Sequence, residues 1–210
     1  IKKNGIINTA KNMIYISIDT ETGGLDWDNH SLLEFGAIIE DTKKQLSFDE
    51  IPKFSVLLEH PGDKYVGSSF ALAMHHEIFK ELSSPPNKRT MNVIPFNKLG
   101  LMFYSWLKEN SKYDFSKTGP VKIVVAGKNF GTFDKRFLDN NPDFNKYIRI
   151  DSRIVDPAIL YYNDEVDENL PNLSECKKRA GLSKITVDHR AINDAWDVIE
   201  VLRGKMYPKI

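Results

Sequence analysis

The stretch MIYISIDTETGG, residues 13–24, decides how this chain folds. Its apolar side chains alternate with polar ones, so one face of a strand carries Ile14, Ile16, Ile18 and Thr20. Asp19 and Glu21 share the other face near the C-terminal end of the strand, where open α/β sheets bind ligands. Two acids at the end of a strand are equally typical of exposed surface residues that have no functional role. The glycines at 23 and 24 favour a site, because glycine lets a backbone approach a ligand closely.

Outward from this strand, the pattern predicts strands first and then strands that alternate with helices. Two more strands are expected at 32–41 and 54–60, and the continuous apolar run at 121–127 is typical of a buried central strand. A further strand is expected near 148–156. Helical patterns occupy 68–82, 92–109, 131–139, 171–180 and 190–205. This order is typical of α/β or α+β chains, and we expect an α/β fold with a mixed sheet.

Length and composition indicate a globular protein of one domain. The chain has 210 residues, of which 41% are hydrophobic and 28% charged, and these values exclude a disordered, collagen-like or coiled-coil chain. We expect a single domain over 13–210, preceded at 1–12 by a flexible leader or an expression remnant. No apolar run approaches the roughly 18 residues that span a bilayer, so no membrane contact is expected. A cytoplasmic location follows from this and from the absence of a signal core.

Cysteine content and charge narrow the possible chemistry. Cys176 is the single cysteine, which excludes an intramolecular disulfide and a cysteine-based zinc site; we expect it to be a small buried core residue. The 29 basic residues balance 29 acidic ones, so any nucleic-acid contact must come from a local basic patch. Lys135 and Arg136 are well placed for such a contact. The charge run at 177–179 is expected to be a solvated helix face.

A third acid, Asp134, lies on an apolar helical stripe. The stripe consists of Phe130, Phe133, Phe137 and Leu138, and Asp134 occupies the i+4 position. An ionised carboxylate that faces a core costs several kcal/mol unless it is paired or metal-bound. Unless Asp134 lies on the stripe by chance, its position predicts a positively charged partner for the carboxylate.

The last helical pattern supplies a fourth acid and a histidine. Asp194 lies about 70° from the centre of the buried stripe, whereas Asp197 lies about 130° away and should be solvated. His189 precedes this helix, where a histidine is commonly a plain capping residue. Asp194, five residues further on, favours a functional interpretation of His189.

Four acids from three separate segments point to a hard, oxygen-liganded cation. With no cysteine and few histidines nearby, magnesium or manganese fits better than zinc. Two such ions, about 3.5–4 Å apart, form the usual clamp for phosphodiester hydrolysis.

These residues resemble the three motifs of the DEDDh exonucleases, the superfamily of proofreading exonucleases, RNase T and oligoribonuclease. D-x-E-T appears at 19–22, N-x-x-x-[FY]-D at 129–134, and H-x-A-x-x-D-A at 189–195, in the family's order. Two departures are the Gly-Gly pair after the first motif and Lys128 where many members have histidine. We expect the ammonium group of Lys128 to lie beside the acids, where it could contact a phosphate of the substrate.

The resemblance implies an RNase H-like fold with a five-stranded mixed sheet flanked by helices. It implies removal of nucleoside monophosphates from the 3′ end of single-stranded DNA or RNA, by a mechanism with two Mg²⁺ or Mn²⁺ ions. The family's metal ligands map onto Asp19, Glu21, Asp134 and Asp194, and its general base, which is carried on a mobile loop, maps onto His189 after residues 184–188. The expected substrate contacts are Thr22, Gly23, Leu25, Asn129 and His76.

Two rival interpretations come from other functional classes. A catalytically silent RNase H-like module could bind nucleic acid, but such a module would typically have lost at least one of the five catalytic residues. An ordinary phosphatase would need a nucleophile or a phosphate-loop motif, and the chain has none of its own. The sequence favours neither DNA nor RNA as the substrate. No motif indicates a protein partner or an oligomeric state.

Overall fold

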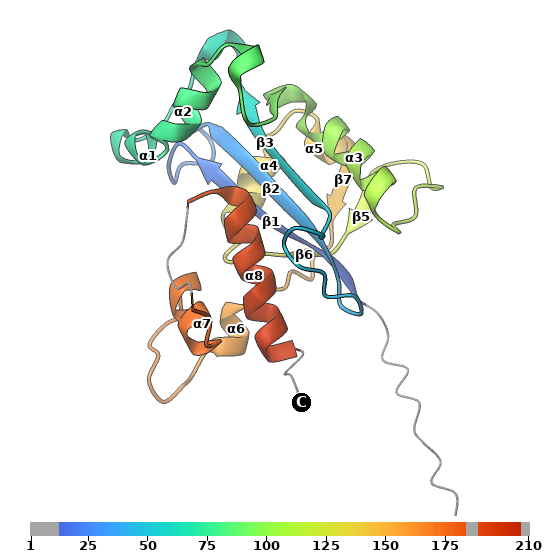
Figure 1. The fold of residues 1–210 in the computed structure, drawn as a ribbon, viewed down its shortest axis with the longest axis vertical. Helices are drawn as coiled ribbons and strands as arrows, with labels where there is room; N and C mark the ends of the chain where they lie inside the picture. Colours follow the sequence, from blue (N-terminus) through green and yellow to red (C-terminus); the bar gives the residue numbers. More distant parts are fainter. Residues whose placement is uncertain (1–12, 184–188, 207–210) are drawn as a thin grey trace, which may run out of the picture.

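The computed structural model describes residues 13–183 and 189–206. Its main sheet has five strands in the order β4-β3-β2-β1-β6 (Figure 1). These strands are β1 (Ile14–Thr22), β2 (Leu32–Asp41), β3 (Lys53–Glu59), β4 (Val93–Pro95) and β6 (Val125–Ala126). The β1–β2 and β2–β3 pairs are antiparallel, whereas the β3–β4 and β1–β6 pairs are parallel. The predicted α/β fold with a five-stranded mixed sheet is confirmed.

The apolar run at 121–127 forms two strands rather than one. β5 (Val121–Ile123) pairs in parallel with β7 (Ile148–Ile150) in a separate two-stranded sheet, and β6 joins β1 in the main sheet. The strand expected near 148–156 is therefore shorter, although Val155 still forms an isolated bridge to Ala126.

Helices cover both faces of the main sheet (Figure 1). The helices of the described residues are α1 (Ser69–Met74), α2 (His76–Ser83), α3 (Leu99–Asn110), α4 (Asp134–Asp139), α5 (Phe144–Tyr147), α6 (Ala158–Tyr161), α7 (Leu173–Arg179) and α8 (Ala191–Met206). Short 3₁₀ turns occupy Pro61–Asp63, Pro86–Lys88 and Phe96–Lys98. The expected helix at 68–82 is interrupted at His75, which ends α1 and precedes α2. The expected helix at 92–109 begins only at Leu99, because Pro95 disfavours a helical Ile94 and this segment pairs with β3 instead.

Strand alternation separates two hydrophobic cores. Ile16 and Ile18 pack with Phe103 of α3 and the aromatic residues around it. Tyr15, on the opposite face of β1, packs with Val198 of α8. Asp19 and Glu21 therefore point toward the side of the sheet that α8 covers. In the described ranges, 13–183 and 189–206, no helix is long and apolar enough to cross a membrane.

Two charge predictions are wrong. Asp197, expected in solvent, is only 7% exposed and forms an ion pair with fully buried Lys177, which was assigned to a solvated face. Arg179, from the same charge run, is partly buried and binds Asp167, with 2.6 Å between Nη2 and Oδ1. The Lys177–Asp197 pair has a tertiary cause: α7 packs against α8, so each helix buries a polar position of the other. Cys176 is fully buried, as predicted.

Candidate active site

Three of the four predicted acids form one cluster at the C-terminal end of β1. One carboxylate oxygen from each of Asp19, Glu21 and Asp194 lies within 4.8 Å of the other two. β1 supplies the first two, and the first turn of α8 supplies Asp194 as it crosses the strand end. Glu21 and Asp194 are 7% and 6% exposed, whereas Asp19 is half-buried, so the cluster is shielded from water on all but one side chain.

Asp134, the fourth acid, lies on the other side of the strand end. It begins α4, is buried, and accepts a 2.6 Å hydrogen bond from the Thr20 hydroxyl. Thr20 alternates with Asp19 along β1, so its side chain faces away from α8. A cation was expected against Asp134; in the described part of the chain, its carboxylate instead accepts a hydrogen bond from this neutral hydroxyl. Asp134 is still close enough for its charge to raise the pKa of Asp19 and Glu21.

Burial makes the ionised cluster unfavourable. It raises the pKa of Asp19 well above the ordinary value, and the charges of Asp134, Asp194, Glu21 and Glu34 add to the effect. Burial and neighbouring carboxylates raise the pKa of Glu21 to about 9. Burial raises the pKa of Asp134 to about 7, although the hydrogen bond from Thr20 opposes the shift.

The donor set fits a hard metal ion. Oε1 of Glu21 is buried and has no hydrogen-bond partner in the described part of the chain. The three clustered ligands are all carboxylate oxygens, the donors that hard divalent cations prefer. A bound cation would neutralise the repulsion that raises these pKa values.

His75 is a site neighbour that the sequence interpretation missed. Its Nε2 lies 3.4 Å from Oε2 of Glu21, its side chain is buried, and burial together with the charge of His189 lowers its pKa. His76, the predicted contact, points to solvent and pairs with Glu77 at 3.2 Å. A signal was present, because His75 lies on the apolar stripe formed by Ala71, His75, Ile78 and Leu82, at helical spacing.

His189 lies two residues before α8, exposed and with a φ of 51°. It is close enough to His75 for its charge to lower the pKa of that histidine. The preceding segment, 184–188, for which a mobile loop was expected, lies outside the described residues.

A groove of about 350 Å³ opens beside the cluster. Its walls come from the end of β1 and from α1, and include Glu21, Thr22, Leu25, Phe70, Met74, His75 and Phe133. Leu25 and Phe70 are 83% and 77% exposed, an unusual position for large apolar side chains. The Thr22 hydroxyl donates a 2.8 Å hydrogen bond to the Gly24 carbonyl, which orders the loop after the strand.

Gly23, which lies between the lining residues Thr22 and Gly24, allows a close backbone contact beside this groove. A Cβ there would lie 2.3 Å from the Val66 carbonyl oxygen, and one on Gly67 would lie 2.3 Å from the Gly23 oxygen. One hydrogen bond joins the two segments directly, from Ser68 N–H to the Gly23 carbonyl at 2.8 Å. Ser31 links them as well, because it accepts from Gly23 N–H at 2.7 Å and donates its own N–H to the Val66 carbonyl at 2.8 Å. The loop after β1 and the segment before α1 are therefore packed backbone to backbone.

The remaining predicted contacts lie outside the groove lining. Asn129 is exposed with a φ of 57°, and its N–H donates a 2.8 Å hydrogen bond to Asp156. Lys128 donates a hydrogen bond to the Asn129 side chain. Lys135 pairs with Asp139 at 2.6 Å, and Arg136 lies over the Trp27 ring at 5.0 Å.

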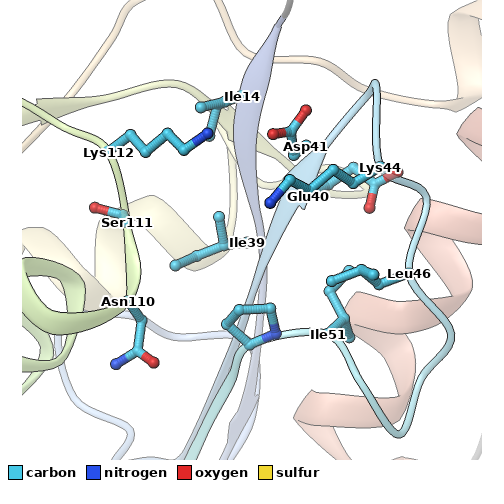
Figure 2. Close-up of a pocket in the computed structure, with 11 residues that line it drawn as sticks. Ile14, Ile39, Glu40, Asp41, Lys44, Leu46, Ile51, Asn110, Ser111 and Lys112 are labelled. Atoms are coloured by element: carbon cyan, nitrogen blue, oxygen red, sulfur yellow. The ribbon is translucent and has the colours of Figure 1, made fainter.

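A second, smaller cavity of about 100 Å³ lies at the opposite end of β1 (Figure 2). Ile14, Ile39, Leu46 and Ile51 provide apolar lining, and Lys44 and Lys112 are also part of it. None of the predicted site residues contributes to this cavity.

Comparison with known proteins identifies the fold. No protein-family model matches the chain, and no curated protein matches it by sequence. Among solved structures, it is similar to E. coli exonuclease I in complex with a dT13 oligonucleotide, with a TM-score of 0.57, 17% identity and coverage of 92% of this chain and 41% of that chain. The complex with a dA16 oligonucleotide gives a TM-score of 0.58, 16% identity and coverage of 91% and 41%.

The zinc-bound form of the E. coli exonuclease I complex with single-stranded DNA gives a TM-score of 0.57, 17% identity and coverage of 90% of this chain and 40% of that chain. The chain thus spans about two fifths of the length of these exonuclease I chains. At this identity, the likeness establishes a shared fold.

Proposed function

We propose that this chain is a metal-dependent 3′→5′ exonuclease of the DEDDh type, which releases nucleoside monophosphates from single-stranded DNA or RNA. The observation that carries the proposal is the cluster of Asp19, Glu21 and Asp194, with oxygens within 4.8 Å at the end of β1. The shared fold supports it, since the similar exonuclease I structures hold single-stranded oligonucleotides.

Asp19, Glu21 and Asp194 would hold Mg²⁺ or Mn²⁺, with Asp134 as the fourth family ligand. The oxygen-only donor set favours these ions over zinc. Two bound ions would supply charge stabilisation for the attacking and leaving oxygens of phosphodiester hydrolysis.

The chain's own residues supply the remaining chemistry. His189, when neutral, accepts the proton of the attacking water at a ring nitrogen. Thr22, Gly23 and Leu25 position the terminal nucleotide, and the exposed apolar groove takes its base only when that base is unpaired. Asn129 and His76, both exposed, would contact the strand beyond the groove. We place this activity in the cytoplasm, because one unpaired cysteine suits a reducing compartment.

The decisive experiment uses 5′-labelled single-stranded DNA and RNA of several lengths, with Mg²⁺ or Mn²⁺. A ladder that shortens from the 3′ end, together with intact circular single-stranded DNA, is the expected result. Cleavage of the circles would show an endonuclease and refute the proposal. Tight binding of the strands with no shortening would instead support the silent binding module.

A further inference from the structure

Two ion pairs between a buried glutamate of β2 and a partly buried arginine tie α8 to β2. Glu34 meets Arg190 just before the helix, with 3.1 Å between Oε2 and Nε, and Glu40 meets Arg203 near its other end, with 2.6 Å between Oε2 and Nη2. Both glutamates are fully buried. Their surroundings differ, because only the first pair adjoins the acid cluster.

Glu34 fixes the chain on both sides of the helix start. It lies directly opposite Glu21 in the β1–β2 register, and Arg190 directly follows His189. Its carboxylate also accepts a hydrogen bond from the backbone N–H of Ala191, the first residue of α8. One buried group therefore holds the segment between His189 and Asp194.

Gly36 provides an independent contact with the same turn. It pairs with Asp19 in the register, and a Cβ there would lie 2.5 Å from both the Ala191 carbonyl carbon and the Ile192 nitrogen. The main chain of α8 thus rests directly on the backbone of β2. Any side chain at Gly36 would push the helix, and Asp194 with it, away from the strand.

We infer that Glu34, Arg190 and Gly36 are positioning residues that set the first turn of α8, so that Asp194 and His189 face Asp19 and Glu21. This inference rests on the proposed function for its catalytic consequence. None of the three is needed to touch substrate. Glu40 and Arg203 anchor the far end of the same helix and provide a matched control.

The test compares Glu34→Gln with Glu40→Gln in the full chain. Both variants remove a buried negative charge from beneath an arginine, and glutamine at 34 can still accept the hydrogen bond from Ala191. The readouts are Mn²⁺ affinity measured without nucleic acid, kcat and KM on a single strand, and urea unfolding. Both variants should lose stability, but only Glu34→Gln should weaken Mn²⁺ binding and lower kcat, each by about 10–100-fold. KM should stay near its wild-type value, because the substrate contacts are intact.

Gly36→Ala is the second variant, and it should weaken Mn²⁺ binding in the same direction. Equal effects of Glu34→Gln and Glu40→Gln on Mn²⁺ affinity and kcat would overturn the inference while leaving an active exonuclease in place. If the wild type degrades no strand, yet Glu34→Gln alone weakens Mn²⁺ binding, the positioning role stands and the proposed function fails. A wild type that binds no Mn²⁺ would overturn both.

Discussion

Glu21→Gln tests whether the acid cluster is under electrostatic stress when it holds no metal. Burial raises the pKa of Glu21 to about 9, from an ordinary value of 4.5. Between these values, the folded protein keeps a proton that the unfolded chain has released, so the free energy of unfolding falls as pH rises. The variant keeps the size of the side chain and removes its titration.

The magnitude follows from one proton. Between its two pKa values, one such group lowers the free energy of unfolding by about 1.4 kcal/mol per pH unit. Between roughly pH 7 and 8.5, the free energy of unfolding of the wild type should therefore fall by about 2 kcal/mol more than that of Glu21→Gln. His60 and His75 act in the opposite direction, because burial lowers the pKa of each. They add stability with rising pH only up to about 6.5, where the unfolded histidines lose their protons, so the chosen window excludes them.

The assay is urea unfolding of metal-stripped protein in excess chelator at both pH values. Asp49→Asn, which removes an exposed carboxylate from a loop, should keep the wild-type dependence. Adding Mg²⁺ or Mn²⁺ should flatten the wild-type curve, because bound cations favour the ionised acids. Parallel curves for the wild type and Glu21→Gln in chelator would show that Glu21 is already ionised, and the reasoning would fail.

Three further predictions concern single residues. Asp19→Asn should abolish hydrolysis while its melting temperature in chelator stays equal to or above that of the wild type, because the change relieves repulsion; a large drop in melting temperature would contradict this. His189→Ala should lower kcat by about 10²–10⁴-fold and keep the metal-induced rise in melting temperature, and loss of that rise would make His189 a ligand rather than a base. Lys177→Ala should cost about 3–5 kcal/mol in urea unfolding, because it deprives buried Asp197 of its ammonium partner, whereas Lys178→Ala on the exposed side should cost little.

The parts of the site that follow local periodicity were predictable from the sequence. Asp19 and Glu21 were assigned to one face of a strand because alternation depends only on neighbouring residues. Helical spacing, which also depends only on neighbouring residues, predicted that Asp194 points toward the core. Asp194 does lie in the acid cluster. His75 could have been found by applying this argument to the helices after β3.

The parts that depend on packing between distant segments were not predictable. Asp197 lies on a polar face of α8, and only the arrival of α7 buries it against Lys177. Similarly, no local pattern in the run at 121–127 indicates that β5 finds β7 as its partner while β6 finds β1. Helical periodicity marked Asp134 as buried, but it could not supply the strand geometry that gives it Thr20 as a partner.

The backbone contact between Gly23 and Gly67 has a consequence for engineering. Because main-chain atoms hold the two walls of the groove together there, its width at that point cannot be tuned by side chains without breaking the contact. Leu25 and Phe70 stand on the same walls, mostly exposed. Libraries that vary these two positions and keep both glycines would therefore reshape what the groove admits on an unchanged frame.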